Sequence, residues 1–171
     1  MSSPPAPARI VVMGPSGSGK SAVGALLAER LGLPFADADD LHPAANVAKM
    51  AAGTPLDDAD RMPWLDLVAA ALAPSPAGAV IACSALARRY RDRIRAGAPD
   101  TVFVELRVLP EELARRMASR EHFMPPALLA SQLQTLEHLG ADEPGVAVLN
   151  DRPVAEVVAT VVAALEARQS L

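Results

Sequence analysis

The residue types best suited to chemistry form one stretch near the start of the chain, Gly14-Pro15-Ser16-Gly17-Ser18-Gly19-Lys20-Ser21. An apolar run precedes it and a helical pattern follows, so the pattern G-x-x-x-x-G-K-[ST] lies in the strand-loop-helix setting in which it binds phosphate. Its glycines let backbone N–H groups turn around phosphate oxygens, and the helix start adds partial positive charge. A plain Gly/Ser turn would not require the Lys-Ser pair. The stretch therefore predicts a nucleotide site.

Side chains in and after this loop suit a nucleotide and its cation. Lys20 would reach the β and γ phosphates, and the Ser21 hydroxyl would hold Mg²⁺. An acidic loop follows the second predicted strand. In that loop Asp37 could hold a Mg²⁺-bound water, and Asp39 could accept a hydrogen bond from a substrate hydroxyl. The alternative is that Asp39 or Asp40 only caps a turn.

Apolar runs alternating with helical patterns set these loops in an α/β fold. Strands are expected at residues 10–13, 33–36, 79–83, 101–108 and 146–149. Helices are expected at residues 22–31, 46–52, 63–72, 85–96, 128–139 and 154–167, with another beginning near residue 109. This alternation predicts a three-layer, doubly wound, parallel five-stranded sheet, whose right-handed crossovers bring the loops named above to one edge.

Two inserted segments are predicted to cover that edge. Residues 40–73 form a substrate flap, in which Lys49 and Arg61 offer cations. Residues 120–127 form a lid after a basic helix, and arginine there would stabilise the charge of a transferring phosphoryl group. The alternative for the flap cations is solvated surface charge, and for the basic helix end it is compensation of the helix dipole.

The helix predicted at residues 85–96 is unusually rich in arginine. Five arginines lie within the eight positions 88–95. They cannot all face one ligand, because successive residues lie about 100° apart around a helix. We expect one or two of them to point inward and the others to be solvated.

Composition narrows the function classes. A chain of 171 residues is most simply one domain, here residues 9–171 after a disordered tail at 1–8. The net charge of −4 argues against nonspecific nucleic-acid or membrane-surface binding. Cys83 is the single cysteine, which excludes an intramolecular disulfide and fits a reducing cytosol. Neither a secretory signal nor a membrane span is expected, so we predict a cytoplasmic protein.

A phosphate-binding loop alone does not choose between a kinase, a switch GTPase and a mechanical ATPase. A GTPase would need a base-reading N-K-x-D motif, which the sequence lacks, and Asp142-Glu143-Pro144-Gly145 matches D-x-x-G only by chance because it follows a helix. A mechanical ATPase would usually show an apolar strand ending in Asp-Glu, which the third and fourth strands do not. The small-molecule kinases remain, because they need only the loop, an acceptor flap and an arginine lid.

Motifs spread over nearly the whole chain resemble those of the gluconate kinases. The phosphate-binding loop is shared by many families, whereas the His-Pro, Pro-Trp-Leu, Cys-Ser-Ala-Leu and His-Phe-Met-Pro elements together are far more specific. Besides the loop at residues 14–21, the matching motifs are Asp37-x-Asp-x-Leu-His-Pro43, Asn46-Val-Ala-Lys-Met50, Gly53-Thr-Pro-Leu56, Asp58-x-Asp-Arg-x-Pro-Trp-Leu65, Cys83-Ser-Ala-Leu86, Tyr90-Arg-Asp92, His122-Phe-Met-Pro125 and Gln132-x-x-x-Leu-Glu137.

The resemblance implies a nucleoside-monophosphate-kinase-like fold and a cytosolic, dimeric enzyme that moves the γ-phosphoryl of ATP, with Mg²⁺, onto the 6-hydroxyl of D-gluconate. It implies that Asp39 orients or deprotonates that hydroxyl, and that Lys20 holds the triphosphate. Arg120 becomes the candidate for the transition-state charge, and Arg116 is placed beside the adenine. The candidates for binding the sugar acid are Asp39, His42, Lys49, Arg61, Ser84, Arg91 and His122.

The chain departs from the family pattern in the lid. There a glycine and a variable residue separate the arginine from His-Phe, whereas Arg120-Glu121-His122-Phe123 is one residue shorter and lacks the glycine. We expect a stiffer lid that closes less completely, so inserting Gly before His122 should change the rate. Three alternatives stay open at this point: shikimate kinase, nucleoside monophosphate kinase, and a regulator that binds ATP without turnover.

Overall fold

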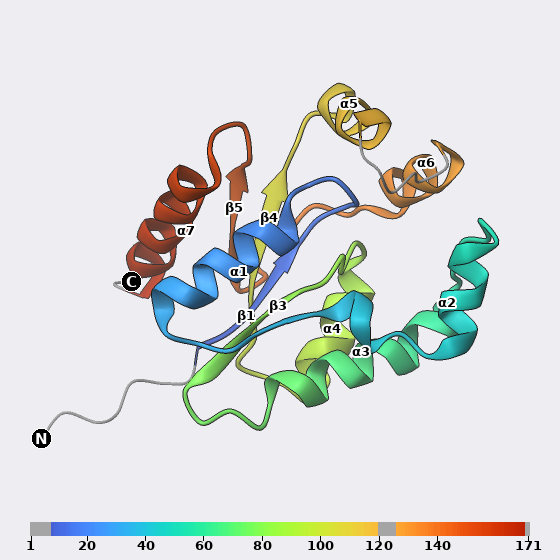
Figure 1. The fold of residues 1–171 in the computed structure, drawn as a ribbon. Coiled ribbons are helices and arrows are strands. Elements are labelled where there is room, and N and C mark those ends of the chain that lie inside the picture. Colours follow the sequence, from blue (N-terminus) through green and yellow to red (C-terminus); the bar gives the residue numbers. More distant parts are fainter. Residues whose placement is uncertain (1–7, 120–125, 170–171) are drawn as a thin grey trace, which may run out of the picture.

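A computed structural model describes residues 8–119 and 126–169. Its centre is a five-stranded sheet in which neighbouring strands pair in parallel in the order β2-β3-β1-β4-β5 (Figure 1). The strands are β1 (Ala8–Met13), β2 (Phe35–Asp37), β3 (Gly78–Ala82), β4 (Val102–Arg107) and β5 (Gly145–Leu149). The predicted five-stranded parallel sheet is confirmed.

Helices cover both faces of this sheet. Helices α1 (Lys20–Leu31) and α7 (Val154–Gln169) pack on one face, while α3 (Asp58–Leu72) and α4 (Arg88–Gly97) pack on the other (Figure 1). The remaining elements are the 3-10 helix η1 (Ala38–Leu41), α2 (Ala44–Ala51), α5 (Pro110–Ser119) and α6 (Pro126–Thr135). The fold is therefore the predicted three-layer arrangement.

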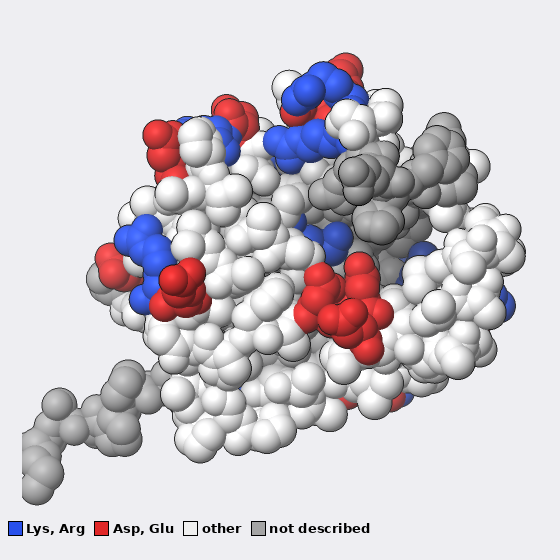
Figure 2. Space-filling model, viewed as in Figure 1, with Lys and Arg blue, Asp and Glu red and all other residues white. Residues whose placement is uncertain are grey.

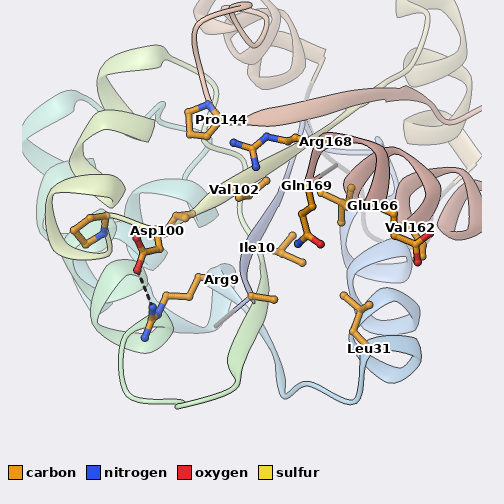
Figure 3. Close-up of a pocket in the computed structure, with 14 residues that line it drawn as sticks. Arg9, Ile10, Leu31, Asp100, Val102, Pro144, Val162, Glu166, Arg168 and Gln169 are labelled. Atoms are coloured by element: carbon orange, nitrogen blue, oxygen red, sulfur yellow. Dashed lines mark ion pairs between the residues drawn. The ribbon is translucent and has the colours of Figure 1, made fainter. Parts of the chain in front are cut away.

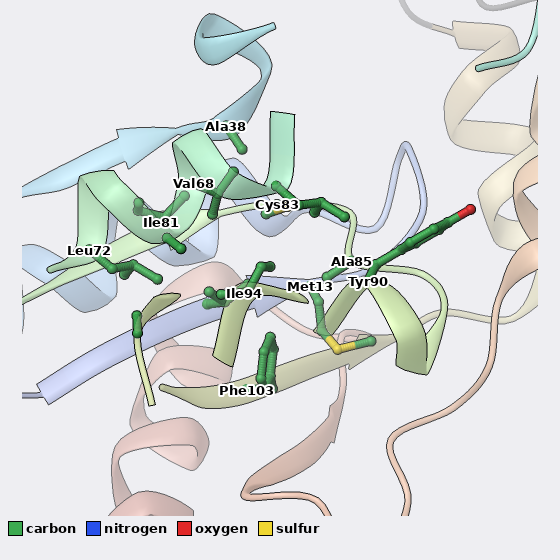
Figure 4. Close-up of a cluster of buried hydrophobic side chains, with 14 of the residues drawn as sticks. Met13, Ala38, Val68, Leu72, Ile81, Cys83, Ala85, Tyr90, Ile94 and Phe103 are labelled. Atoms are coloured by element: carbon green, nitrogen blue, oxygen red, sulfur yellow. The ribbon is translucent and has the colours of Figure 1, made fainter. Parts of the chain in front are cut away.

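The central strand β1 contributes side chains to both halves of the core. Its side chains alternate between the two sides of the sheet, as the strand period requires. Val11 and Met13 join the cluster under α3 and α4, and Ile10 and Val12 join the cluster under α1 and α7. Met13 and Phe103 lie together in the first cluster (Figure 4). The largest aromatic side chains are confined to that cluster, and the other is built from aliphatic residues.

Two helices begin at residues other than those predicted. Helix α3 begins at Asp58 and not at Pro63, because Asp57 and Asp60 form a capping box, with Asp60 N donating to Asp57 Oδ1 at 2.9 Å. Pro63 is thus the sixth helical residue. Helix α4 begins at Arg88 and not at Ala85, since Ala85 has φ 42°, in the left-handed region that a helix excludes.

Other boundaries shift by a few residues. The strand β1 already begins at Ala8, which was predicted to end the tail, and residues 1–7 lie outside the described residues. Helix α6 ends at Thr135 and not at residue 139, because two buried carboxylates hold the segment that follows: Leu139 N donates to Glu105 Oε2 at 3.0 Å, and Gly140 N donates to Glu143 Oε2 at 2.8 Å. Within residues 8–119 and 126–169 we find no helix with the length and apolar content needed to cross a bilayer.

Candidate active site

The loop between β1 and α1 has the geometry of a phosphate cradle. Gly14, Gly17 and Gly19 have φ of 152°, 84° and 87°, which side chains rarely adopt. A Cβ on Gly19 would also lie 2.5 Å from Asn150 Nδ2, so only glycine fits there. The N-cap residue, Gly19, makes no side-chain hydrogen bond to the first turn of α1, which leaves N–H groups of that turn for an anion. Lys20 is the first residue of that helix.

Three consecutive residues of the loop are held by side chains from later elements. Arg116 Nη1 on α5 donates to Gly17 O at 3.0 Å, and Asn150 Nδ2 after β5 donates to Ser18 O at 2.7 Å. Ser16 N donates to Gln132 Oε1 on α6 at 2.8 Å. Sequence reasoning assigned no role to Asn150, and it quoted Gln132 only as part of a motif.

Arg116 also joins the loop to the end of β5. Its Nη2 donates to Asn150 O at 3.1 Å, and its Nε donates to Glu112 at 3.1 Å. Beside it lies a cavity of about 470 Å³ at the carboxyl ends of β4 and β5, lined by Val108, Leu109, Glu112, Arg116, Leu149, Asn150, Asp151 and Arg152. Arg116 thus lies next to the phosphate-binding loop and next to a cavity large enough for a base.

The predicted cation ligands lie in contact. Ser21 Oγ donates to Asp37 Oδ2 at 2.5 Å, although 16 positions separate them in sequence. Parallel pairing of β2 with β3 brings Asp37 to the edge at which α1 begins. A hydroxyl and a carboxylate fit Mg²⁺, which prefers oxygen and is often held by one or two protein groups together with water and phosphate. The described residues contain no group of three or more His, Cys, Asp and Glu side chains suited to a metal.

In the acidic turn after β2, one aspartate caps the turn and the others have free carboxylates. Asp37 Oδ1 accepts from Asp39 N at 2.9 Å, so Asp37 is the N-cap of η1. The capping role considered for Asp39 or Asp40 therefore belongs to Asp37. Within the described residues the Asp39 carboxylate accepts no hydrogen bond, and its side chain is exposed. Figure 2 shows acidic side chains gathered beside a hollow of the surface, where the chain leaves β2.

His42 follows this turn, and its contacts define the tautomer of its ring. Its ring stacks on Trp64 with centroids 4.1 Å apart, and Trp64 Nε1 donates to Ala38 O at 2.7 Å. Asn46 Nδ2 lies 3.2 Å from His42 Nδ1. An amide nitrogen can only donate, so Nδ1 accepts and the neutral ring carries its proton on Nε2. Burial lowers the pKa of His42, as does the Arg61 charge, while Asp39 acts in the opposite direction.

Among the described residues, Arg61 has no carboxylate partner. It forms no ion pair within the described part of the chain, and its Nη1 donates to Tyr90 Oη at 2.7 Å. Tyr90 Oη in turn donates to Asp58 Oδ1 at 2.6 Å, which fixes the phenol. Lys20 likewise forms no ion pair with a described residue. The two cations remain available for anionic ligands.

Lys49 has a partner in the flap itself. Its Nζ lies 2.7 Å from Asp60 Oδ2, and hydrogen bonding in this pair raises the pKa of Lys49 and lowers that of Asp60. The contact ties α2 to the capping box of α3. Lys49 therefore has a structural role in the described geometry, and its role toward an acceptor stays a prediction.

Arg91 was predicted to bind the sugar acid, but its surroundings do not fit that role. Its side chain is 0% exposed, and it forms a bidentate ion pair with Glu143 at 2.8 and 2.9 Å. Its Nη1 donates to Ala85 O and Leu86 O, at 2.9 and 3.3 Å. A ligand therefore cannot reach its guanidinium. Arg91 positions the loop after β3 and is not a direct ligand of the sugar acid.

The loop after β3 contacts the phosphate-binding loop. Ser84 O accepts from Gly14 N at 3.2 Å, which brings Ser84 to the predicted edge. Neighbouring Cys83 is buried, and burial raises the pKa of its thiol to about 12. Cys83 is thus a packing residue of the core. The predicted lid residues Arg120 and His122 lie outside the described residues.

Another cavity lies away from this site. It measures about 550 Å³ and opens at the amino ends of the strands, between residues such as Ile10, Val102 and Val162 (Figure 3). Arg9 and Asp100 form an ion pair at its rim. Ligands of doubly wound sheets bind at the carboxyl ends of the strands, where the phosphate-binding loop, Asp37 and Ser84 meet.

The fold and this edge together define a phosphate-loop kinase that acts on a small molecule. The family model described as shikimate kinase matches residues 16–160. The chain is 49% identical over 150 residues to a gluconokinase of Gluconobacter oxydans, covering 85% of this chain and 84% of the relative. It is 42% identical to the thermoresistant gluconokinase of Escherichia coli, covering 89% and 90%. The chain belongs to the gluconokinase family.

Solved structures agree with that membership. The crystal structure of a gluconokinase from Sinorhizobium meliloti matches with a TM-score of 0.87 and 48% identity, over 94% of this chain and 92% of the other. The shikimate kinase of Aquifex aeolicus matches with a TM-score of 0.64 and 19% identity, over 94% and 98%. The second likeness, at 19% identity, shows a shared fold.

Proposed function

We propose that this protein transfers the γ-phosphoryl group of ATP to the 6-hydroxyl of D-gluconate, giving 6-phospho-D-gluconate and ADP. The observation that carries the proposal is the high identity to gluconokinases over most of both chains. The contact of Ser21 with Asp37, two residues before the free carboxylate of Asp39, supports it from the geometry.

In the proposed reaction the acceptor hydroxyl lies against Asp39. The hydroxyl oxygen attacks the γ-phosphorus, the bond to the β,γ-bridging oxygen breaks, and the hydroxyl proton passes to the Asp39 carboxylate. Lys20 and the N–H groups at the start of α1 hold the triphosphate. Positioning and charge stabilisation supply most of the rate in such transfers. Arg120 is proposed to stabilise the transition-state charge.

Ser21 and Asp37 are proposed to hold Mg²⁺. When bound, this ion supplies charge neutralisation at the β and γ phosphates. The adenine is proposed to occupy the cavity beside Arg116, next to the phosphate-binding loop.

The sugar acid is proposed to bind between the flap and the loop after β3. Arg61 suits its carboxylate, because a guanidinium donates two parallel hydrogen bonds and this one has no acidic partner among the described residues. The Nε2–H of neutral His42 suits a sugar hydroxyl. Ser84, Lys49 and His122 are further candidates that the contacts above leave as proposals.

Location and assembly follow from the family resemblance as proposals. We infer that the protein is cytoplasmic and forms a homodimer. Light scattering at two protein concentrations would test the dimer. A constant mass of one chain would contradict the dimer. The segments proposed to move are the flap at residues 40–73 and the lid at residues 120–127.

The assay that tests the proposed function measures ADP release from Mg-ATP with D-gluconate, shikimate or AMP as the sole acceptor. Mass detection of the phosphorylated product accompanies it. Turnover with gluconate and appearance of 6-phosphogluconate are expected. Turnover with shikimate alone, which the family model makes the second candidate, would overturn the acceptor assignment. ATP binding without any acceptor-dependent ADP release would indicate the regulator.

A further inference from the structure

Gln132 contacts the phosphate-binding loop in a different way from the two other side chains that hold this loop. Arg116 and Asn150 each donate to a backbone carbonyl of the loop. Gln132 instead binds Ser16 at two atoms, through Ser16 N to Gln132 Oε1 at 2.8 Å and through Gln132 Nε2 to Ser16 Oγ at 3.2 Å. The carboxamide thus fixes the backbone and the side chain of one loop residue together.

This double contact sets the direction of the Ser16 hydroxyl. A backbone N–H can only donate, so the amide atom that faces Ser16 N is the oxygen of Gln132. The other amide atom is then the NH₂ group, and Ser16 Oγ must accept from it. A hydroxyl has one proton to donate. Because Oγ already accepts from Gln132, that proton is free to point to a different acceptor.

Ser16 lies where such an acceptor would be a phosphate oxygen. It belongs to the glycine-rich cradle, is partly exposed, and follows Gly14, whose N–H contacts the acceptor-side loop at Ser84. We propose that Gln132 is a positioning residue that holds Ser16 so that its hydroxyl donates to a phosphoryl oxygen of the nucleotide. This inference rests on the proposed function and adds a residue from α6 to the phosphate site.

A double-mutant cycle tests the coupling. Gln132→Ala and Ser16→Ala should each lower kcat/KM for Mg-ATP about tenfold to hundredfold, the range of a hydrogen bond to a charged group. The kcat/KM of the double variant should be no lower than that of the more impaired single variant, because both changes remove the same hydrogen bond. The KM for gluconate should stay unchanged. Gln134→Ala is the matched control, since Gln134 is exposed on the same helix.

An isosteric variant separates positioning from folding. In Gln132→Glu the carboxylate still accepts from Ser16 N, so exchange of the Ser16 amide proton, measured by NMR, should stay slow. The same carboxylate accepts the Ser16 hydroxyl proton and turns it from the nucleotide, so Mg-ATP should bind more weakly. Adding Gln132→Glu to Ser16→Ala measures the effect of the charge alone, which should be the smaller part.

Calorimetry of Mg-ATP without an acceptor keeps this inference separate from the acceptor assignment. If the wild type shows no gluconate-dependent turnover, the proposed function fails, while the Mg-ATP affinities of the four proteins of the cycle still decide the role of Gln132. Losses that multiply in the double variant would overturn the inference. Wild-type Mg-ATP affinity in Gln132→Ala would overturn it as well.

Discussion

Three aspartates in one acidic turn have different surroundings. Both oxygens of Asp37 accept hydrogen bonds, from Ser21 and from Asp39 N. The Asp39 and Asp40 carboxylates accept none from the described residues and are exposed. At the scale of single residues, the exposed carboxylate of Asp39, two positions after Asp37, is therefore the group proposed to bind the acceptor hydroxyl.

Replacing Asp39 should separate binding from turnover. We expect Asp39→Asn to lower kcat for gluconate phosphorylation by about 10²- to 10⁴-fold, the range of general-base catalysis, with little change in Mg-ATP affinity. Gluconate-dependent ADP release measures it, and Asp40→Asn, one residue on in the same turn, is the control. Wild-type turnover in Asp39→Asn would rule out both a base and a positioning role.

The His42 pKa predicts a pH dependence of stability. Because burial lowers this pKa below its ordinary 6.5 in the folded chain, the unfolded chain takes up the proton first as pH falls. The stability that neutral His42 contributes is present above about pH 6.5 and is lost as pH falls toward the folded pKa, by at most about 1.4 kcal/mol per pH unit.

Urea denaturation of the wild type and of His42→Gln at pH 7.5 and 5.5 measures this effect. The wild type should lose more stability than the variant between the two values, and the other titrating groups cancel in the comparison. An equal loss in both proteins would show that His42 does not titrate differently on folding.

At the scale of elements, helix α4 shows how one face of a helix can be structural and the other solvated. Arg91 is buried against Glu143, whereas Arg88, Arg89 and Arg93 pair at the surface with Asp142, Asp58 and Asp66. The expectation that one or two arginines point inward is confirmed. The buried one holds the carbonyls of the loop that contacts the phosphate-binding loop.

Removing Arg91 should destabilise the fold far more than removing a neighbour. Arg91→Met leaves the Glu143 carboxylate buried without its main partner, which costs about 3–5 kcal/mol in the free energy of unfolding. Arg93→Met, two residues on, removes an exposed pair with Asp66 and should cost less than about 1 kcal/mol. Chemical denaturation compares the two. Similar losses would contradict a structural role for the Arg91–Glu143 pair.

Sequence reasoning predicted the features whose cause is local. The glycines, Lys20 and Ser21 are set by one short motif, and the five strands by runs of apolar residues. It could not single out the buried arginine of α4, because Glu143 lies 52 positions away. It also placed the start of α3 at Pro63, since proline is common at helix starts, and missed that Asp57 and Asp60 cap each other.

Sequence reasoning missed three residues near the site for the same reason. Asn150, Tyr90 and Gln132 act on other residues, on Ser18, Arg61 and Ser16, and each contact joins segments far apart in sequence. Nothing in their own sequence neighbourhoods marks these partners. Only the order of the strands brings them together.

At the scale of the whole molecule, one edge of the sheet holds the proposed chemistry and the rest supplies stability. Mg-ATP at about 100 times its dissociation constant should add about 2.7 kcal/mol. For a chain of this size that is a rise in Tm of roughly 5–10 °C. Lys20→Ala should abolish the rise, and Arg30→Ala, the matched loss of a cation at the other end of α1, should keep it. Thermal melts with and without Mg-ATP measure both, and a full rise in Lys20→Ala would contradict the assignment.

The three contacts that hold the phosphate-binding loop also bear on the order in which the chain is made. Synthesis of the loop motif is finished at Ser21, but Arg116, Gln132 and Asn150, which fix its backbone, follow about 95 to 130 residues later. Strand β1, which presents the loop, gains its neighbour β4 only at residues 102–107. A nascent chain therefore carries the nucleotide signature long before it can hold that signature in its binding shape.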